Sequence, residues 1–408
     1  MKRVYRHLTT AAKRLFRNNT NLALLNLLHI LNDGAKTGML ILLPFIAKDL
    51  HINLTQVGML GTILNICSFL FALPAGYISA KVGGLKAVIF ALCLYGIGFL
   101  TSGFVPSVDG SFLFLIFTFF IAGMGFGLFH PIGLALIARW SDKATRGREM
   151  GNFTALGDIG TVGVPAVFTF FIVLVGWRLV SMSFAVIALI IFFILYVFYL
   201  SKTERGEDRI KQQQNISFKT LLKNRQLLIA ITASALDTFT SSPLFVFLPF
   251  LLLKKGIPPV WLGVVSALFF IGSFAGKSIF GRAADKFGNV RTFVISEIGM
   301  AVFILILVTA QPLPIILVTC VIIGIFTKGT VPVIPTMISD AVEHEGVLEK
   351  ALGLNGFFTG IASTLAPLVL GFISDKFTIN AAFTVMAGVA MLAIVPAVLV
   401  KLPRVKVL

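Results

Sequence analysis

Twelve long apolar stretches, separated by short charged or Gly/Pro-containing segments, dominate this sequence. A helix needs about 20 apolar residues to cross the hydrocarbon core of a bilayer. Hydrophobic residues make up 57% of the 408 positions and charged residues 12%, a balance that a soluble protein cannot bury in one core. We therefore predict an all-α integral membrane protein. The expected spans are 21–47, 54–80, 87–105, 112–138, 150–174, 178–200, 227–253, 259–281, 291–310, 313–338, 351–374 and 378–400.

Positive charge is distributed unevenly over the segments between these spans. If the N-terminus is cytoplasmic, 26 of the 34 Lys and Arg residues fall in the cytoplasmic segments. This is the positive-inside pattern of a protein with both termini in the cytoplasm. The net charge of +17 therefore indicates the lipid bilayer, and not a nucleic acid, as the partner of the basic residues.

The chain also divides into two similar halves. We expect a cytoplasmic N-terminal segment (1–20), a six-helix bundle (21–200), a cytoplasmic linker (201–226), a second six-helix bundle (227–400) and a cytoplasmic tail (401–408). An offset of 204 or 205 residues relates five features of the two halves, which predicts pseudo-symmetric bundles around a central cavity. The related pairs are Asp33 and Asp237, Leu43-Pro44-Phe45 and Leu248-Pro249-Phe250, Gly58 and Gly263, Gly76 and Gly281, and Gly83 and Gly288.

The loops after the second and eighth spans carry a recognisable motif. They read GYISAKVGGLK (76–86) and GRAADKFGNVR (281–291), which resemble the Gly-x-x-x-Asp-Arg/Lys-x-Gly loop of the major facilitator superfamily. The resemblance implies the major facilitator fold, with an inner charge network resting mainly on the second copy, because Ala80 replaces the acid in the first. The loop residues assigned to this gating network are Gly76, Gly83, Gly281, Asp285, Lys286, Gly288 and Arg291.

Two further motifs resemble the fosmidomycin-resistance group of efflux proteins within that superfamily. One is His29-x-x-Asn32-Asp33 in the first span, and the other is the Gly-rich run 123–140, which contains His130. The fourth span has Phe119 at the position where many proton antiporters of the superfamily place an arginine. The prediction of proton antiport therefore lacks the support that this arginine would give.

Ionisable residues inside spans are costly, so each requires a partner, a wet cavity or a function. Three of them, His29, Asp33 and Lys36, follow helical spacing with Asn32 beside them, so they share one helix face. The resemblance implies that spans 1, 4, 7 and 10 line the cavity. The residues predicted to contact substrate are His29, Asn32, Asp33, Lys36, His130 and Lys328, and those predicted to couple protons are Asp33, Asp237 and His130.

Structural explanations compete with these roles. Asp33 could simply pair with Lys36, Asp237 could be a neutral hydrogen-bonded acid, and His130 could only accompany the kink at Pro131. Lys328, in an interrupted helix, is expected to pair with an acid or to bind an anionic substrate.

Four charged residues outside this substrate set are expected to have packing or gating roles. Asp158 and Lys277 are expected to pair across the two halves, at the gate. Glu297 and Asp340 are expected near the cytoplasmic ends, as parts of the inner charge network.

These features predict a secondary transporter of the bacterial inner membrane, multi-pass and monomeric. The sequence contains no nucleotide-binding loop, so a proton gradient is the expected energy source. We expect no cofactor, no enzymatic activity and no metal site. The favoured function is proton-coupled export of a small amphipathic or anionic solute by alternating access. Uptake of an organic acid, amino acid or carboxylate iron chelator remains an alternative, as does a non-transporting scaffold or sensor.

Overall fold

A computed structural model describes residues 2–107, 110–141, 146–200, 221–342 and 345–400. In the described part of the chain all regular structure is helical. The helices of the first half are α1 (Lys2–Asp49), α2 (Leu54–Ala72), α3 (Ala75–Val82), α4 (Gly84–Gly103), α5 (Ser111–Trp140), α6 (Arg146–Val175) and α7 (Trp177–Leu200). Those of the second half are α9 (Arg225–Lys254), α10 (Trp261–Phe287), α11 (Asn289–Thr309), α12 (Leu313–Asp340), α13 (Glu345–Lys376) and α14 (Ile379–Leu399).

Twelve of these helices are long and apolar enough to cross a membrane, which confirms the predicted all-α membrane fold with twelve spans. One expected span needs correction. The predicted second span, 54–80, is broken into α2 and α3 around Pro74, because proline lacks an N–H and clashes with the preceding turn. Helix α1 begins at Lys2, and its candidate span begins at Thr20. Most of the predicted linker and the tail 401–408 lie outside the described residues.

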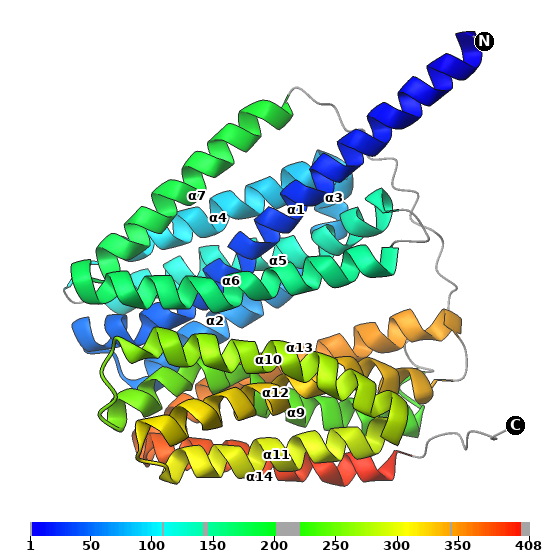
Figure 1. Cartoon of the computed structure of the whole chain (residues 1–408). Helices are drawn as coiled ribbons and strands as arrows, with labels where there is room; N and C mark the ends of the chain where they lie inside the picture. The colour runs from blue at the N-terminus through cyan, green and yellow to red at the C-terminus, as the bar shows by residue number, and fades with distance from the viewer. Residues whose placement is uncertain (1, 108–109, 142–145, 201–220, 343–344, 401–408) are drawn as a thin grey trace, which may run out of the picture.

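Each half packs chiefly on itself. In the first half α1 lies on α6, and α4 lies between α5 and α7; in the second, α10 packs on α12 and α11 packs on α14. Two helix pairs join the halves, α2 with α13 and α6 with α10. Figure 1 shows the halves as two layers, with the start of α1 and the end of α14 on the same side of the bundle.

Repeat-related glycines make the contacts between halves close. A Cβ on Gly58 of α2 would lie 2.2 Å from the carbonyl oxygen of Pro367 on α13. A Cβ on Gly263 of α10 would lie 2.9 Å from Cα of Ala166 on α6. Only glycine fits at either position without movement of the neighbouring backbone, so the halves meet in the same way at both related sites.

Charged and capping residues close the end of the bundle opposite the chain termini. The carboxylate of Asp375, at the end of α13, accepts hydrogen bonds from the N–H groups of Leu54 and Thr55 at 3.0 and 2.6 Å. The Thr55 hydroxyl donates a third at 2.6 Å. An acid from one half thereby caps the N-terminus of α2 in the other half, where the helix dipole favours negative charge.

The central cavity as candidate functional site

A cavity of about 610 Å³ lies between the two halves and is lined by residues of α1, α2, α5, α6, α9, α10, α12 and α13. Hydroxyl groups provide much of its polar wall, among them those of Ser241, Ser242, Ser273 and Ser363. Such a mixed wall, with charged groups from both halves, suits a small polar solute.

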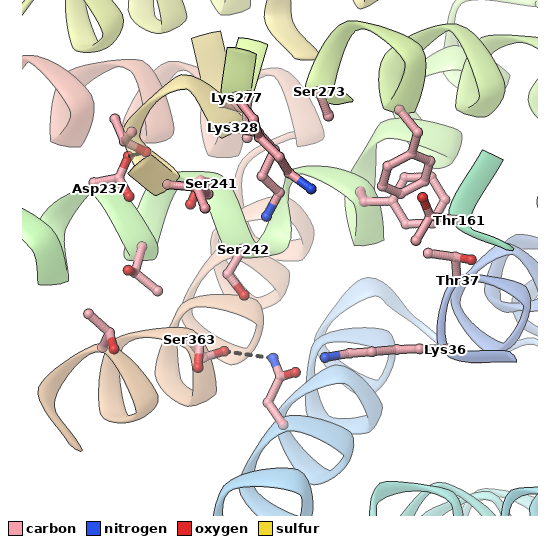
Figure 2. Close-up of a pocket in the computed structure, with 18 of the residues that line it drawn as sticks. Lys36, Thr37, Thr161, Asp237, Ser241, Ser242, Ser273, Lys277, Lys328 and Ser363 are labelled. Carbon is pink, nitrogen blue, oxygen red and sulfur yellow. Dashed lines mark hydrogen bonds between the residues drawn. The ribbon is translucent and has the colours of Figure 1, made fainter. Parts of the chain in front are cut away.

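Three lysines reach this cavity. Lys36 comes from α1, whereas Lys277 and Lys328 come from α10 and α12 in the other half. Figure 2 shows Lys36 pointing into the space that Lys277 and Lys328 reach from another wall. Among the described residues, no carboxylate lies within ion-pair distance of Lys36 or Lys328. Two ammonium groups from opposite halves therefore remain available to an anion.

Lys277 differs from the other two because it is paired. Its Nζ lies 2.7 and 2.8 Å from the carboxylate oxygens of Asp158 on α6. The structure thus places these two residues in contact across the halves. Both also line the cavity, so their pair bounds the solute space as well as joining the halves.

Asp33 is held by histidines and not by Lys36. Its Oδ2 lies 3.1 Å from Nε2 of His29, one turn earlier on α1, and its Oδ1 lies 3.3 Å from Nε2 of His130 on α5. Asn32 donates a hydrogen bond to Oδ1 at 2.8 Å. The alternative in which Asp33 serves only to neutralise Lys36 is therefore wrong for this conformation.

Local packing fixes this cluster. His29 is 3% exposed and stacks on Phe153 of α6 with ring centroids 3.8 Å apart. Its Nδ1 donates a hydrogen bond of 2.8 Å to the backbone carbonyl of Phe153. A Cβ on Gly157 would lie 2.5 Å from the His29 ring and 2.7 Å from the Asp33 carboxylate, so this glycine creates the room for both.

Asp237 has an acidic neighbour that sequence analysis placed elsewhere. Asp237 on α9 is 4% exposed and accepts a hydrogen bond of 3.1 Å from Thr330 on α12. The carboxyl group of Glu297 on α11 is near enough to interact with it electrostatically. Glu297 is completely buried, and neither of its carboxyl oxygens accepts a hydrogen bond from a described residue. The expected position of Glu297 in a network at the helix ends is therefore wrong.

The predicted site residues within the spans divide into those that line the cavity and those that do not. Asp33, Lys36, His130, Asp158, Asp237, Lys277 and Lys328 line it. His29 and Asn32 are not among the lining residues, because His29 packs against Phe153 of α6 and Asn32 is completely buried.

The loop motifs lie at the far ends of the spans. Gly83 and Gly288 end α3 and α10 with φ of +94° and +86°, conformations that favour glycine. Asp285, Lys286 and Arg291 are exposed, and no ion pair of these three with another described residue occurs. The expected inner charge network is not assembled in this conformation.

Comparison with known proteins identifies the family. The sequence profile of the Major Facilitator Superfamily matches residues 25–268 and, in a second match, residues 230–407. The chain belongs to the major facilitator superfamily. Two similar superfamily proteins are the "Probable nitrate transporter NarT" of Staphylococcus haemolyticus, 24% identical over 86% of this chain and 90% of the relative, and that of Staphylococcus aureus strain Newman, 26% identical over 82% and 83%.

Solved structures of the superfamily show the same fold. A bacterial homologue of the human lysosomal transporter Spinster, in an inward-facing and occupied conformation, has a TM-score of 0.74 at 14% identity and covers 94% of this chain and 96% of its own. The inward-open xylose transporter XylE of E. coli has a TM-score of 0.74 at 16% identity, with 95% and 97% covered. The matches do not single out the fosmidomycin-resistance group, so that resemblance remains a prediction.

Proposed function

We propose that this superfamily transporter carries a small anion by alternating access, with Lys36 and Lys328 as the binding cations. One observation carries the proposal: two lysine side chains with no carboxylate of the described residues within ion-pair distance face one cavity from opposite halves. The nitrate transporters related to this chain carry a small anion by name, which favours the anionic over the amphipathic solute.

The geometry also suggests how an anion would drive closure. With the cavity empty, the positive charges of Lys36 and Lys328 repel each other across the halves. A bound anion replaces this repulsion by two attractions, in a setting of low dielectric where such charges interact strongly. The loaded cavity therefore closes more readily than the empty one, as a coupled transporter requires.

The acid pair of Asp237 and Glu297 is the proposed proton site. Two ionised carboxylates cannot stay in contact in a buried site, so the pair holds at least one proton. Asp237 lines the cavity and is attracted by the charge of Lys328. An anion that neutralises Lys328 removes this attraction, and Asp237 then binds a proton more firmly. Anion and proton thus favour each other's binding.

Such mutual support favours symport, with anion and proton moving together across the membrane of a bacterial cell. The export by proton antiport that the sequence suggested requires the two ligands to exclude each other instead. Both alternatives keep the same cavity and the same anion class. They differ in the sign of proton movement, which makes the direction of coupling measurable.

The test uses purified protein in proteoliposomes that contain a pH-sensitive dye, with the membrane potential clamped by potassium and valinomycin. Nitrate, formate, a larger carboxylate, a zwitterion and a cation are added outside in turn. Symport predicts anion uptake with acidification of the interior, and antiport predicts uptake with alkalinisation. Anion uptake without any pH change would remove proton coupling, and uptake of only the zwitterion or cation would contradict the anion class.

A further inference from the structure

The three side chains that converge beside the cavity, His29, Asp33 and His130, have the composition of a metal centre. They supply two imidazole nitrogens and a carboxylate, and their ligand atoms all lie within 4.8 Å of one another. The sequence predicted no metal site. The structure, however, brings the carboxylate of Asp33 beside both histidines.

The distances match a coordination sphere. Bonds of about 2.0–2.2 Å to a tetrahedral ion place neighbouring ligand atoms roughly 3.3–3.6 Å apart. Here the Nε2 atoms of His29 and His130 are 3.4 Å apart, Nε2 of His29 lies 3.1 Å from Oδ2 of Asp33, and Nε2 of His130 lies 3.3 Å from Oδ1. The two histidines contact different carboxylate oxygens, so an ion between them is bound by both oxygens or by one oxygen after rotation of the Asp33 carboxylate.

The surroundings orient the ligands. Nδ1 of His29 donates to the Phe153 carbonyl, so in the neutral imidazole that binds a metal the lone pair of Nε2 is directed at Asp33 and His130. Histidine ligands of metals usually donate their other ring N–H in this way. Asn32 holds one carboxylate oxygen, and Phe153 stacks on the His29 ring. These contacts prepare the group for an ion before any ion arrives.

The cluster is closed on one side and open on the other. His29 is buried, whereas the side chain of His130 is 46% exposed and lines the cavity together with Asp33. An ion here would have three protein ligands and a fourth position facing the cavity. Lys36, which lies one turn from Asp33 on α1, opposes any cation at this point. Binding therefore depends on all three ligands acting together.

We propose that His29, Asp33 and His130 bind a divalent transition-metal ion of borderline softness, such as Zn²⁺, with its open position toward the cavity. All three ligands belong to the same half, on α1 and α5, so the ion does not cross-link the two halves. The proposal concerns a site distinct from Lys328 and from the acid pair.

The test measures Zn²⁺ binding to the full chain in detergent, without a polyhistidine tag, by calorimetry, and the visible spectrum of bound Co²⁺, which reports tetrahedral coordination. We expect one saturable ion per chain. His130→Gln and Asp33→Asn should each weaken binding by at least about tenfold, since loss of even an outer partner costs 10–100-fold. His51→Gln, which changes an exposed histidine at the end of α1, is the matched control and should bind as wild type.

Lys36→Gln separates this proposal from the proposed function. It removes a repelling charge and should tighten Zn²⁺ binding severalfold, while it weakens anion binding. Absence of saturable Zn²⁺ binding, or equal binding by wild type and His130→Gln, would show that these three residues do not form a metal site. Such a result would overturn the metal proposal without affecting the proposed anion transport. Since His130 is half exposed, its variant is expected to fold, which thermal unfolding checks.

Discussion

Asp158 of α6 and Lys277 of α10 form an ion pair of 2.7 Å that joins the two halves at the wall of the central cavity. The pair is partly exposed, with side chains 18% and 26% accessible. Solvent therefore screens the attraction between the two charges, and breaking the pair during transport costs little free energy. A pair in this position can hold one conformation and release it when the halves rock.

Asp158→Asn should slow transport while tightening anion binding. The substitution frees Lys277, which adds a third unpaired ammonium to the cavity and weakens the contact between halves. We expect a roughly fivefold fall in turnover in the proteoliposome assay, since a lost contact of about 1 kcal/mol changes populations about fivefold. The charge swap Asp158→Lys with Lys277→Asp should recover part of the rate; a swap as slow as the single variant would argue against the pairing.

Lys36→Gln and Lys328→Gln should each weaken anion binding by about 10–100-fold, because a hydrogen bond to a charged group contributes roughly 1.5–3 kcal/mol. Competition by unlabelled anion in detergent measures the affinity directly. Lys81→Gln, which changes an exposed lysine at the end of α3, is the control. Normal affinity in both cavity variants would remove the lysines from the binding site.

Asp237→Asn should abolish anion-driven proton movement and retain anion exchange between equal pools. The amide keeps the size and the hydrogen bond from Thr330 but cannot bind a proton. Exchange of labelled for unlabelled anion, measured beside the pH signal, separates the two functions. Proton movement that survives in this variant would assign the carrier to another group.

Asp375→Ala should loosen the end of the bundle opposite the chain termini. The carboxylate caps α2 from the other half, and losing such a cap costs about 1 kcal/mol, or about fivefold in the equilibrium between closed and open forms. The rate at which a maleimide labels Ser374→Cys, in a chain whose native cysteines are replaced, reports this opening. Asp375→Asn, which keeps one acceptor, should fall between wild type and alanine.

Gly160→Ala should destabilise the protein, whereas Gly163→Ala, one turn away on α6, should not. A Cβ at Gly160 would lie 2.0 Å from the Ile30 carbonyl oxygen on α1, and nothing lies within 4 Å of a Cβ at Gly163. Overpacking of this kind costs about 1–3 kcal/mol. Thermal unfolding in detergent compares the two, and equal midpoints would contradict the close packing of α1 on α6.

The sequence by itself determined the class of fold. Twelve spans could be predicted because the length and apolar character of each are local properties, and the paired motifs at Gly83 and Gly288 could be predicted because turns depend on nearby residues. The break at Pro74 is not predicted, although proline is a local signal. The apolar run continues beyond this residue, so 54–80 reads as one span.

Only the tertiary structure decided which side chains meet. Spacing along α1 puts Asp33 near both His29 and Lys36, but the packing of α5 and α6 against α1 brings its carboxylate into contact with His29 and His130. The acid pair of Asp237 and Glu297 joins residues 60 positions apart on different helices, and nothing in the spacing of either residue indicates it. Helix periodicity fixes the face on which a residue lies, whereas the rotation and neighbours of that helix follow from the packing of the whole bundle.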